Sequence, residues 1–168
     1  MKISDNGINM LKQLEGCVKN SDRHIIYDDQ TGKSLNAKSP LPRGATIGYG
    51  HLIKLNENFA AGLTESQATD LLRQDIIFAE SAVNKYINVP LTQNQYDALV
   101  MFVFNIGVNN FVNSTVVKYV NNPGFQSSRY PTLKSAWLAW NKSNGREMPG
   151  LSNRRAKELE LYYLQTAV

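Results

Sequence analysis

From residue 63 onward, hydrophobic residues recur at the spacing of amphipathic helices. Thr64-Glu65-Ser66-Gln67 has the form of a helix capping box, and apolar residues then return every three or four positions toward Tyr86. A second capping pattern over residues 92–95 precedes a segment ending at Phe104 that is apolar on every face, which predicts a helix at the centre of a core. The pattern therefore predicts a long connecting helix over 64–86, this central helix, and further helices at 114–120, 132–140 and 152–164.

Before residue 63, glycine and proline are frequent and the pattern changes. Ser4 is a plausible N-cap for a short amphipathic helix, and Gly16 predicts that this helix ends at Glu15. Residues 24–53 combine short apolar runs with turn residues, which favours short antiparallel strands. Residues 33–43 carry two prolines among polar residues and are expected to form an exposed loop.

Composition narrows the class of protein. A chain of 168 residues, 42% hydrophobic and 19% charged, can bury one core or two small lobes that share an interface. No apolar run reaches the ~18 residues of a membrane span, and the first residues lack a secretory signal, so we expect synthesis in a cytoplasm without an export address. The single cysteine, Cys17, excludes an internal disulfide and a zinc-cysteine site.

The net charge of +4 favours a polyanionic partner, whether nucleic acid, an anionic membrane or a cell wall. Basic residues are scattered rather than clustered with stacking aromatics, which disfavours nucleic-acid binding. Glu158 and Glu160 disfavour a membrane-active basic helix near residues 153–165. A non-catalytic module that grips wall polymers or nucleic acid is the alternative to an enzyme.

Carboxylates are the candidates for chemistry, because the chain has no nucleophile elbow, phosphate loop or HExxH pattern. Glu15 lies at a helix C-terminus, where the macrodipole disfavours the ionised form, as a general acid requires; the alternative is a solvated surface glutamate. Asp28 and Asp29 lie in a polar turn suited to an ionised carboxylate that orients water; the alternative is that each bonds its own backbone.

The segment Thr46-Ile47-Gly48-Tyr49-Gly50-His51 has two glycines within a predicted strand. Glycines there weaken a strand unless another backbone or a ligand approaches closely, although a simple bulge is also possible. Combined with Glu15-Gly16, Tyr27 and Asp29, this segment resembles the phage lysozyme family, the endolysin muramidases of glycoside hydrolase family 24. The likeness continues at Leu63-Thr64 and at residues 104–107, 113–115 and 150–155.

The resemblance implies the roles of three catalytic residues. Glu15 corresponds to the acid, and Asp29 and Thr46 correspond to the residues that position a water molecule, with inversion at the anomeric carbon. Asp28 is the rival of Asp29, which we prefer because the family places its aspartate two residues after a tyrosine, here Tyr27. The substrate is expected between two lobes, with Phe104, Asn105 and Arg155 as substrate-binding residues.

The implied fold is α+β, predominantly α: one phage-lysozyme domain over 1–168 with two lobes joined by a long helix. Residues 16–63 would form a small β-containing catalytic lobe, and residues 1–15 and 64–168 a helical lobe. Relative to compact family members, the segments at 17–23 and 33–43 are extended and should border the cleft.

The resemblance also implies partners and location. The substrate would be the glycan strands of peptidoglycan, and no cofactor, metal, nucleic acid or stable membrane association is expected. The protein would be a monomer that stays in the host cytoplasm until lysis, depends on a separate membrane-pore protein, and then reaches the periplasm and cell wall.

One structural pair is predicted as well. Asp75 lies on the apolar stripe of the helix that begins at Thr64, and a carboxylate there needs a partner because burial of an unpaired charge is costly. His51 is the nearest plausible cation, and the family likeness sets the two positions facing each other. The alternative is that Asp75 is solvated at the edge of the stripe.

Overall fold

The chain folds into two units, which are described separately. The computed structural model describes residues 1–36 and 40–165. One unit comprises Asn9–Ile76, and the other comprises Met1–Ile8 with Ile77–Val168. Helix α1 (Asp5–Glu15) starts in the second unit and ends in the first. The sequence expectation placed all of α1 and residues 64–76 in the helical lobe; the division differs because α2 (Glu65–Asp75) packs on β2 and β5.

Local signals fix both ends of α1. The Ser4 hydroxyl accepts the Gly7 N–H at 3.0 Å, which caps the N-terminus as expected. Gly16 follows the last helical residue with φ +68°, a left-handed conformation that glycine adopts without strain, so the helix ends at Glu15. The start of the chain is also held by the buried Asp97, which accepts the Ser4 N–H at 3.0 Å and also the Ser4 hydroxyl.

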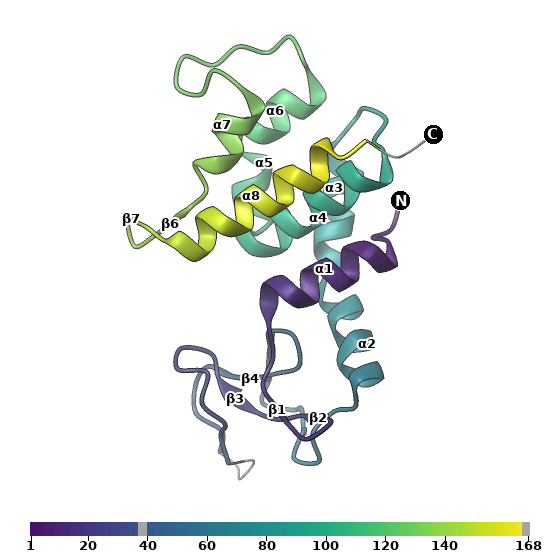
Figure 1. Ribbon diagram of the computed structural model, residues 1–168, viewed down its shortest axis with the longest axis vertical. Helices are drawn as coiled ribbons and strands as arrows, with labels where there is room; N and C mark the ends of the chain where they lie inside the picture. The colour runs from purple at the N-terminus through teal and green to yellow at the C-terminus, as the bar shows by residue number, and fades with distance from the viewer. Residues whose placement is uncertain (37–39, 166–168) are drawn as a thin grey trace. The chain divides into compact units, whose positions relative to one another are not determined.

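Two small antiparallel sheets occupy the unit 9–76. The first is a hairpin of β1 (Lys19–Asn20) and β2 (Arg23–His24), and the second has the order β3 (Tyr27–Asp28), β4 (Ala45–Ile47), β5 (His51–Leu52). Figure 1 shows β3 and β4 side by side. The apolar run at 24–27 is divided between the two sheets, because His24 pairs with Lys19 whereas Tyr27 pairs with Thr46.

The expected loop at 33–43 is partly outside the described residues. At its start, Ser34 bridges Tyr27 and the Leu35 N–H donates to the Ile26 carbonyl at 2.8 Å, so this portion lies against β3. Residues 37–39 are not described.

The expected single helix over 64–86 is instead two helices, α2 and α3 (Ile77–Tyr86). The capping box is confirmed: the Thr64 hydroxyl accepts the Gln67 N–H, and the Gln67 side chain accepts the Thr64 N–H. Ile76 lies between the two helices, with φ −84° and ψ −5°. This ψ is far from the helical value of about −42°, so the regular helix is interrupted at this residue.

The helical unit is built around the predicted central helix. This helix, α4 (Gln93–Ile106), is buried from Tyr96 to Val103, and α8 (Pro149–Tyr163) runs alongside it (Figure 1). The remaining elements are α5 (Val108–Val112), α6 (Thr115–Asn121), α7 (Leu133–Leu138), β6 (Lys142–Ser143) and β7 (Arg146–Glu147).

Two features of this unit differ from the sequence expectation. Helix α5 follows Gly107 and was not expected, because its five residues are too few to show a helical period. Helix α8 begins at Pro149 rather than at Ser152, because proline at the first helical position has no N–H to satisfy. The expected turn at Asn144-Gly145 joins β6 to β7, with positive φ at both residues as such hairpin turns require.

A buried ion network ties α8 to α7. Glu158 is fully buried and accepts the Trp137 indole N–H at 2.9 Å, and it forms ion pairs with Arg154 at 3.2 Å and Arg155 at 3.1 Å. Burial raises the pKa of Glu158, and the two guanidinium groups oppose that shift.

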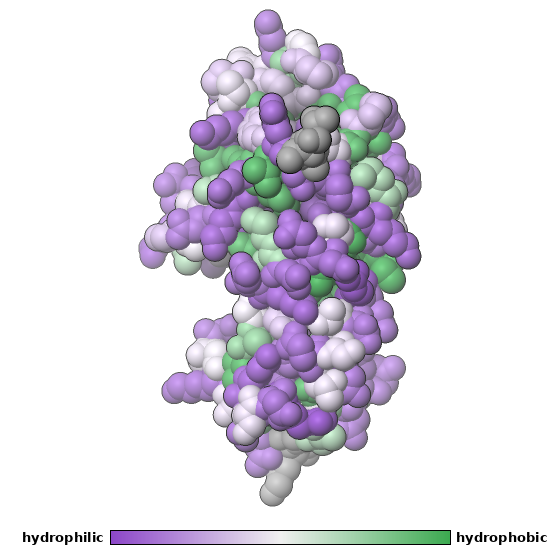
Figure 2. Space-filling view, turned by 45° about the vertical axis from the view of Figure 1, so that its right-hand side comes forward, coloured by the Kyte–Doolittle hydropathy of each residue, from purple (hydrophilic) through white to green (hydrophobic). Residues whose placement is uncertain are grey.

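The surface contrasts with this core. The face in Figure 2 is mainly hydrophilic, and its apolar residues form separate patches. Among the described residues, no helix combines the length and apolar character needed to cross a membrane.

Candidate active site

The backbone at Gly50 comes close to the side chain of Glu15. A Cβ at Gly50, where φ is +88°, would lie 3.4 Å from Glu15 Oε2. Gly48, with φ +64°, lies against α2, where a Cβ would meet Ala68 at 3.6 Å. Of the two explanations for the paired glycines, close approach fits this geometry. The loop between β4 and β5 therefore forms one wall around the Glu15 carboxylate.

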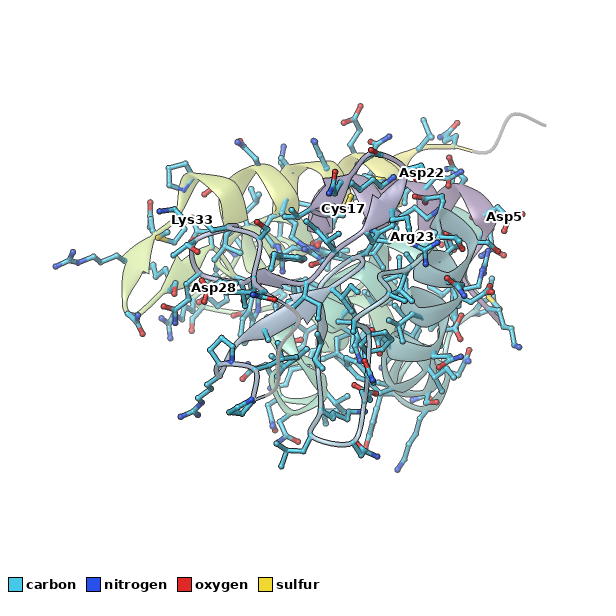
Figure 3. All side chains as sticks on the ribbon, turned by 90° about the horizontal axis from the view of Figure 1, so that it is seen from below. Asp5, Cys17, Asp22, Arg23, Asp28 and Lys33 are labelled. Carbon is cyan, nitrogen blue, oxygen red and sulfur yellow. The ribbon has the colours of Figure 1, made fainter. Side chains whose placement is uncertain are left out.

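The two adjacent aspartates have different surroundings. Asp28 Oδ1 accepts the backbone N–H groups of Thr31 at 2.8 Å and Gln30 at 3.1 Å, and these hydrogen bonds lower the pKa of Asp28. Its N–H donates to the Lys33 carbonyl at 2.9 Å, and Figure 3 labels both residues at this turn. The Asp29 side chain is exposed. The turn chemistry considered for both residues is thus found at Asp28.

Thr46 lies on the central strand of the three-stranded sheet, opposite Tyr27. The residue is 2% exposed, and its hydroxyl donates to the Gly44 carbonyl at 3.0 Å. The Asp29 N–H donates to the same carbonyl at 3.2 Å. A single carbonyl therefore fixes the backbone of Asp29 and the hydroxyl rotamer of Thr46.

Both Asp29 and Glu15 influence the phenol of Tyr27. Its pKa is raised first by burial and then by the negative charges of Asp29 and Glu15, whereas a hydrogen bond with the Gly50 backbone acts in the opposite direction. The Tyr27 phenol therefore lies within electrostatic reach of both acids. From the sequence, Tyr27 served only to identify Asp29 two residues later, because no local pattern indicates where the tyrosine hydroxyl points.

The predicted pair of His51 and Asp75 is confirmed. His51 Nδ1 lies 2.9 Å and 3.0 Å from the two Asp75 carboxylate oxygens, and the histidine is 5% exposed. A second carboxylate was not foreseen: Glu57 Oε2 lies 2.9 Å from His51 Nε2 and also accepts the Lys54 N–H at 2.9 Å. Together they anchor β5 to α2 and to the turn at 54–57.

The candidate substrate-binding residues of the helical unit have distinct environments. Phe104 is partly exposed and stacks on Phe78, with ring centroids 6.0 Å apart. Asn105 is exposed, and its Oδ1 accepts Arg155 Nη2 at 2.6 Å. Arg155 is fully buried, with its guanidinium 5.1 Å from the centre of the Phe102 ring. Arg155 is therefore not a surface cation, and its hydrogen bond orients the Asn105 amide.

A pocket of about 650 Å³ opens beside Asn105. Its wall mixes polar and apolar side chains: asparagine and hydroxyl groups lie beside aliphatic residues, together with Trp140 and Lys142 from the segment after α7. The sequence did not reveal this pocket, because its lining comes from five separate chain segments. Among residues 1–36 and 40–165, no group of three or more His, Cys, Asp or Glu side chains could hold a metal ion.

The Phage lysozyme family profile matches residues 12–158. The chain is 36% identical over 165 residues to the endolysin of Salmonella phage P22, covering 96% of this chain and 98% of that protein. It is 35% identical over 162 residues to the endolysin of Bacillus phage PZA, but spans 55% of that longer protein.

Solved structures show the same likeness. The muramidase domain of SpmX from Asticaccaulis excentricus matches with a TM-score of 0.72 and 34% identity over 98% of this chain and 99% of that one. A variant of P22 lysozyme matches with a TM-score of 0.71 and 34% identity over 96% and 98%. Because the family profile covers most of the sequence and these structures share its fold from end to end, the chain belongs to the phage lysozyme family.

Proposed function

We propose that this protein is an endolysin muramidase that hydrolyses the β-1,4 linkage between N-acetylmuramic acid and N-acetylglucosamine in peptidoglycan. Its catalytic residues would be Glu15, Asp29 and Thr46. The observation that carries the proposal is that the Asp29 N–H and the Thr46 hydroxyl donate hydrogen bonds to the same Gly44 carbonyl. Both residues lie in the unit that also contains Glu15.

Glu15 acts as the general acid. It protonates the glycosidic oxygen as the bond to the anomeric carbon breaks, and the leaving sugar departs as a neutral alcohol. The left-handed turn at Gly16 ends the helix directly after Glu15, so the carboxyl group lies at the C-terminus of α1. The close backbone of Gly50 limits where the carboxyl can move.

Asp29 and Thr46 act on the attacking water. The Thr46 proton is engaged by the Gly44 carbonyl, so the free lone pairs of the hydroxyl oxygen are acceptors for a water hydrogen. The exposed Asp29 carboxylate accepts the other hydrogen, takes the proton as the C–O bond forms, and stabilises positive charge developing on the sugar ring. Attack by water on the face opposite the leaving group inverts the anomeric configuration.

Asn105 would bind the glycan or its peptide from the helical unit, with Arg155 orienting its amide and Phe104 offering an aromatic face. Support comes from the exposure of Asn105 and its position in the wall of the pocket. We also propose that the protein is a monomer that lyses its host from inside. It would leave the cytoplasm through a pore formed by a separate membrane protein. Turbidity clearing by the purified protein, with and without permeabilised host membranes, tests that dependence.

The test of the reaction is mass spectrometry of digested peptidoglycan. We expect fragments that end in reducing N-acetylmuramic acid; an anhydro end or a cut peptide would identify a different enzyme. Glu15→Gln keeps the shape of the side chain but cannot deliver a proton, so the rate should fall by ~10² to 10⁴. Retention of more than about a tenth of the rate would show that Glu15 is not the acid.

The adjacent aspartates form a matched pair of variants. Asp29→Asn should abolish most activity, whereas Asp28→Asn removes the same charge one residue earlier and should act only through its turn. Polarimetry or NMR of the first product anomer then separates inversion from retention. A larger loss of activity for Asp28→Asn, at equal folded fraction, would transfer the role to Asp28.

A further inference from the structure

The side chain of Glu65 gathers four donors from separate segments of the unit 9–76. Oε1 lies 2.6 Å from Tyr49 Oη and 3.1 Å from Lys12 Nζ. Oε2 lies 2.8 Å from Lys19 Nζ and 2.9 Å from His24 Nε2. The capping box explained Thr64 and Gln67 but gave no role to the glutamate between them.

The position of Glu65 keeps its carboxylate ionised. As the first residue of α2, it lies at the positive end of the helix dipole. Although desolvation acts in the opposite direction, hydrogen bonds from Lys19, Tyr49, His24 and Lys12 hold its pKa far below the usual range. The same contact helps to raise the pKa of the Tyr49 phenol, after burial, so that Tyr49 stays a donor.

The four contacts surround the segment that carries Glu15. Lys12 precedes Glu15 by three residues on α1, and Lys19 follows it by four on β1. Tyr49 directly precedes Gly50 in the chain, and a Cβ atom placed at Gly50 would lie 3.4 Å from Glu15 Oε2. One carboxylate thus binds both flanks of Glu15 and the wall that faces it.

The donors around Glu65 also contact one another. His24 is fully buried, and its ring meets that of Tyr49 edge-on, with centroids 5.0 Å apart. Lys12 Nζ lies 5.4 Å from the centre of the same tyrosine ring. The charge of Glu65 also reaches Cys17, in the turn after α1 (Figure 3): burial raises the pKa of this thiol, Lys19 lowers it and Glu65 raises it.

From this geometry we propose that Glu65 is a positioning residue, which holds the Glu15 segment and the facing loop in their catalytic arrangement. The inference rests on the proposed role of Glu15 as the acid. Glu65 acts through Lys12, Lys19 and Tyr49 and touches no substrate. Its side chain is 47% exposed, and exposed ion pairs contribute little to stability. Loss of Glu65 should therefore reduce turnover far more than it reduces the unfolding temperature.

The kinetic test compares Glu65→Gln with Asp70→Asn. Asp70 lies on the same helix and is exposed, and its side chain makes no hydrogen bond or ion pair within the described part of the chain, so its variant controls for the loss of one charge. We expect Glu65→Gln to lower kcat by about tenfold or more with little change in KM, because displacement of a reacting group by ~1 Å has effects of this order. A kcat within about twofold of the Asp70→Asn value would overturn the inference.

Cys17 gives a second readout that needs no catalysis. It is the single thiol of the chain and is exposed, so the pH dependence of its alkylation by iodoacetamide reports on this turn alone. Glu65→Gln removes a charge that raises the thiol pKa and leaves Lys19, which lowers it. The midpoint of alkylation should move to lower pH, and Asp70→Asn should not move it. An unchanged midpoint in Glu65→Gln would also overturn the inference.

The two proposals fail in different ways. If Glu15→Gln lyses walls, the proposed function of Glu15 is wrong, whatever Glu65→Gln does. If Glu15→Gln is inactive and Glu65→Gln turns over like Asp70→Asn, only the positioning role of Glu65 is wrong. Melting temperatures of all three variants show whether a loss of rate follows a loss of folded protein.

Discussion

Replacement of His51 should destabilise the unit 9–76 by breaking two ion pairs at once. The imidazole lies between Asp75 and Glu57, with contacts of 2.9 Å on each side. Its side chain is 6% exposed, and each carboxylate side chain is 24% exposed. His51→Asn leaves two carboxylates facing a neutral amide in a largely enclosed place.

The magnitude lies between two limits. Removal of one partner from a fully buried pair costs about 3 to 5 kcal/mol, and exposed pairs contribute about 0 to 1 kcal/mol. Because the histidine is buried and the carboxylates are about three-quarters covered, we expect His51→Asn to lower the free energy of unfolding by roughly 3 kcal/mol. Asp75→Asn should cost more than Glu57→Gln, because Asp75 presents both oxygens to Nδ1.

The assay is a double-mutant cycle by urea unfolding at about pH 5.5. We expect His51→Asn and Asp75→Asn to be non-additive, with a coupling energy of about 1 to 2 kcal/mol. Additive losses at this pH would refute the ion pair.

The pH dependence gives an independent check. The pKa of Glu57 is lowered: desolvation opposes the shift, but the Lys54 N–H and the His51 contact outweigh it. A carboxyl group with a depressed folded pKa contributes stability above its unfolded pKa of ~4.3 and loses it as pH falls through the folded value. The advantage of the native protein over His51→Asn should therefore shrink in acid.

Two glycine comparisons test close packing. Gly7→Ala should destabilise the protein by about 1 to 3 kcal/mol, because a Cβ there would lie 2.7 to 2.8 Å from buried side-chain atoms. Gly150→Ala in α8 places a Cβ with no atom within 4 Å, so this control should be neutral or stabilising. Equal unfolding midpoints for the two variants would contradict the prediction. Gly50→Ala should reduce lysis more than Gly145→Ala at equal folded fraction, because both strain a positive φ but only Gly50 faces Glu15. Equal rates would mean that the approach to Glu15 has no functional effect.

Much of the helical part of the fold could be predicted because its signals are local. The capping boxes at Thr64 and Thr92, the stop at Gly16 and the apolar run of α4 depend on residues three or four positions apart, which a sequence displays directly. The same holds for the hairpin turn at Asn144. The different roles of Asp28 and Asp29 could not be predicted this way, because they depend on which carboxylate accepts the backbone N–H groups of the turn.

The sequence by itself determined the capped starts of α2 and α4, that Glu15 terminates a helix, and that Asp75 needed a partner. Tertiary structure decided the interruption at Ile76, the second carboxylate on His51, and the meeting of four donors on Glu65. The physical reason is range: helix propensity and capping act over a single turn of chain. Hydrogen bonds and ion pairs depend on distances of about 3 Å between side chains that only folding brings together.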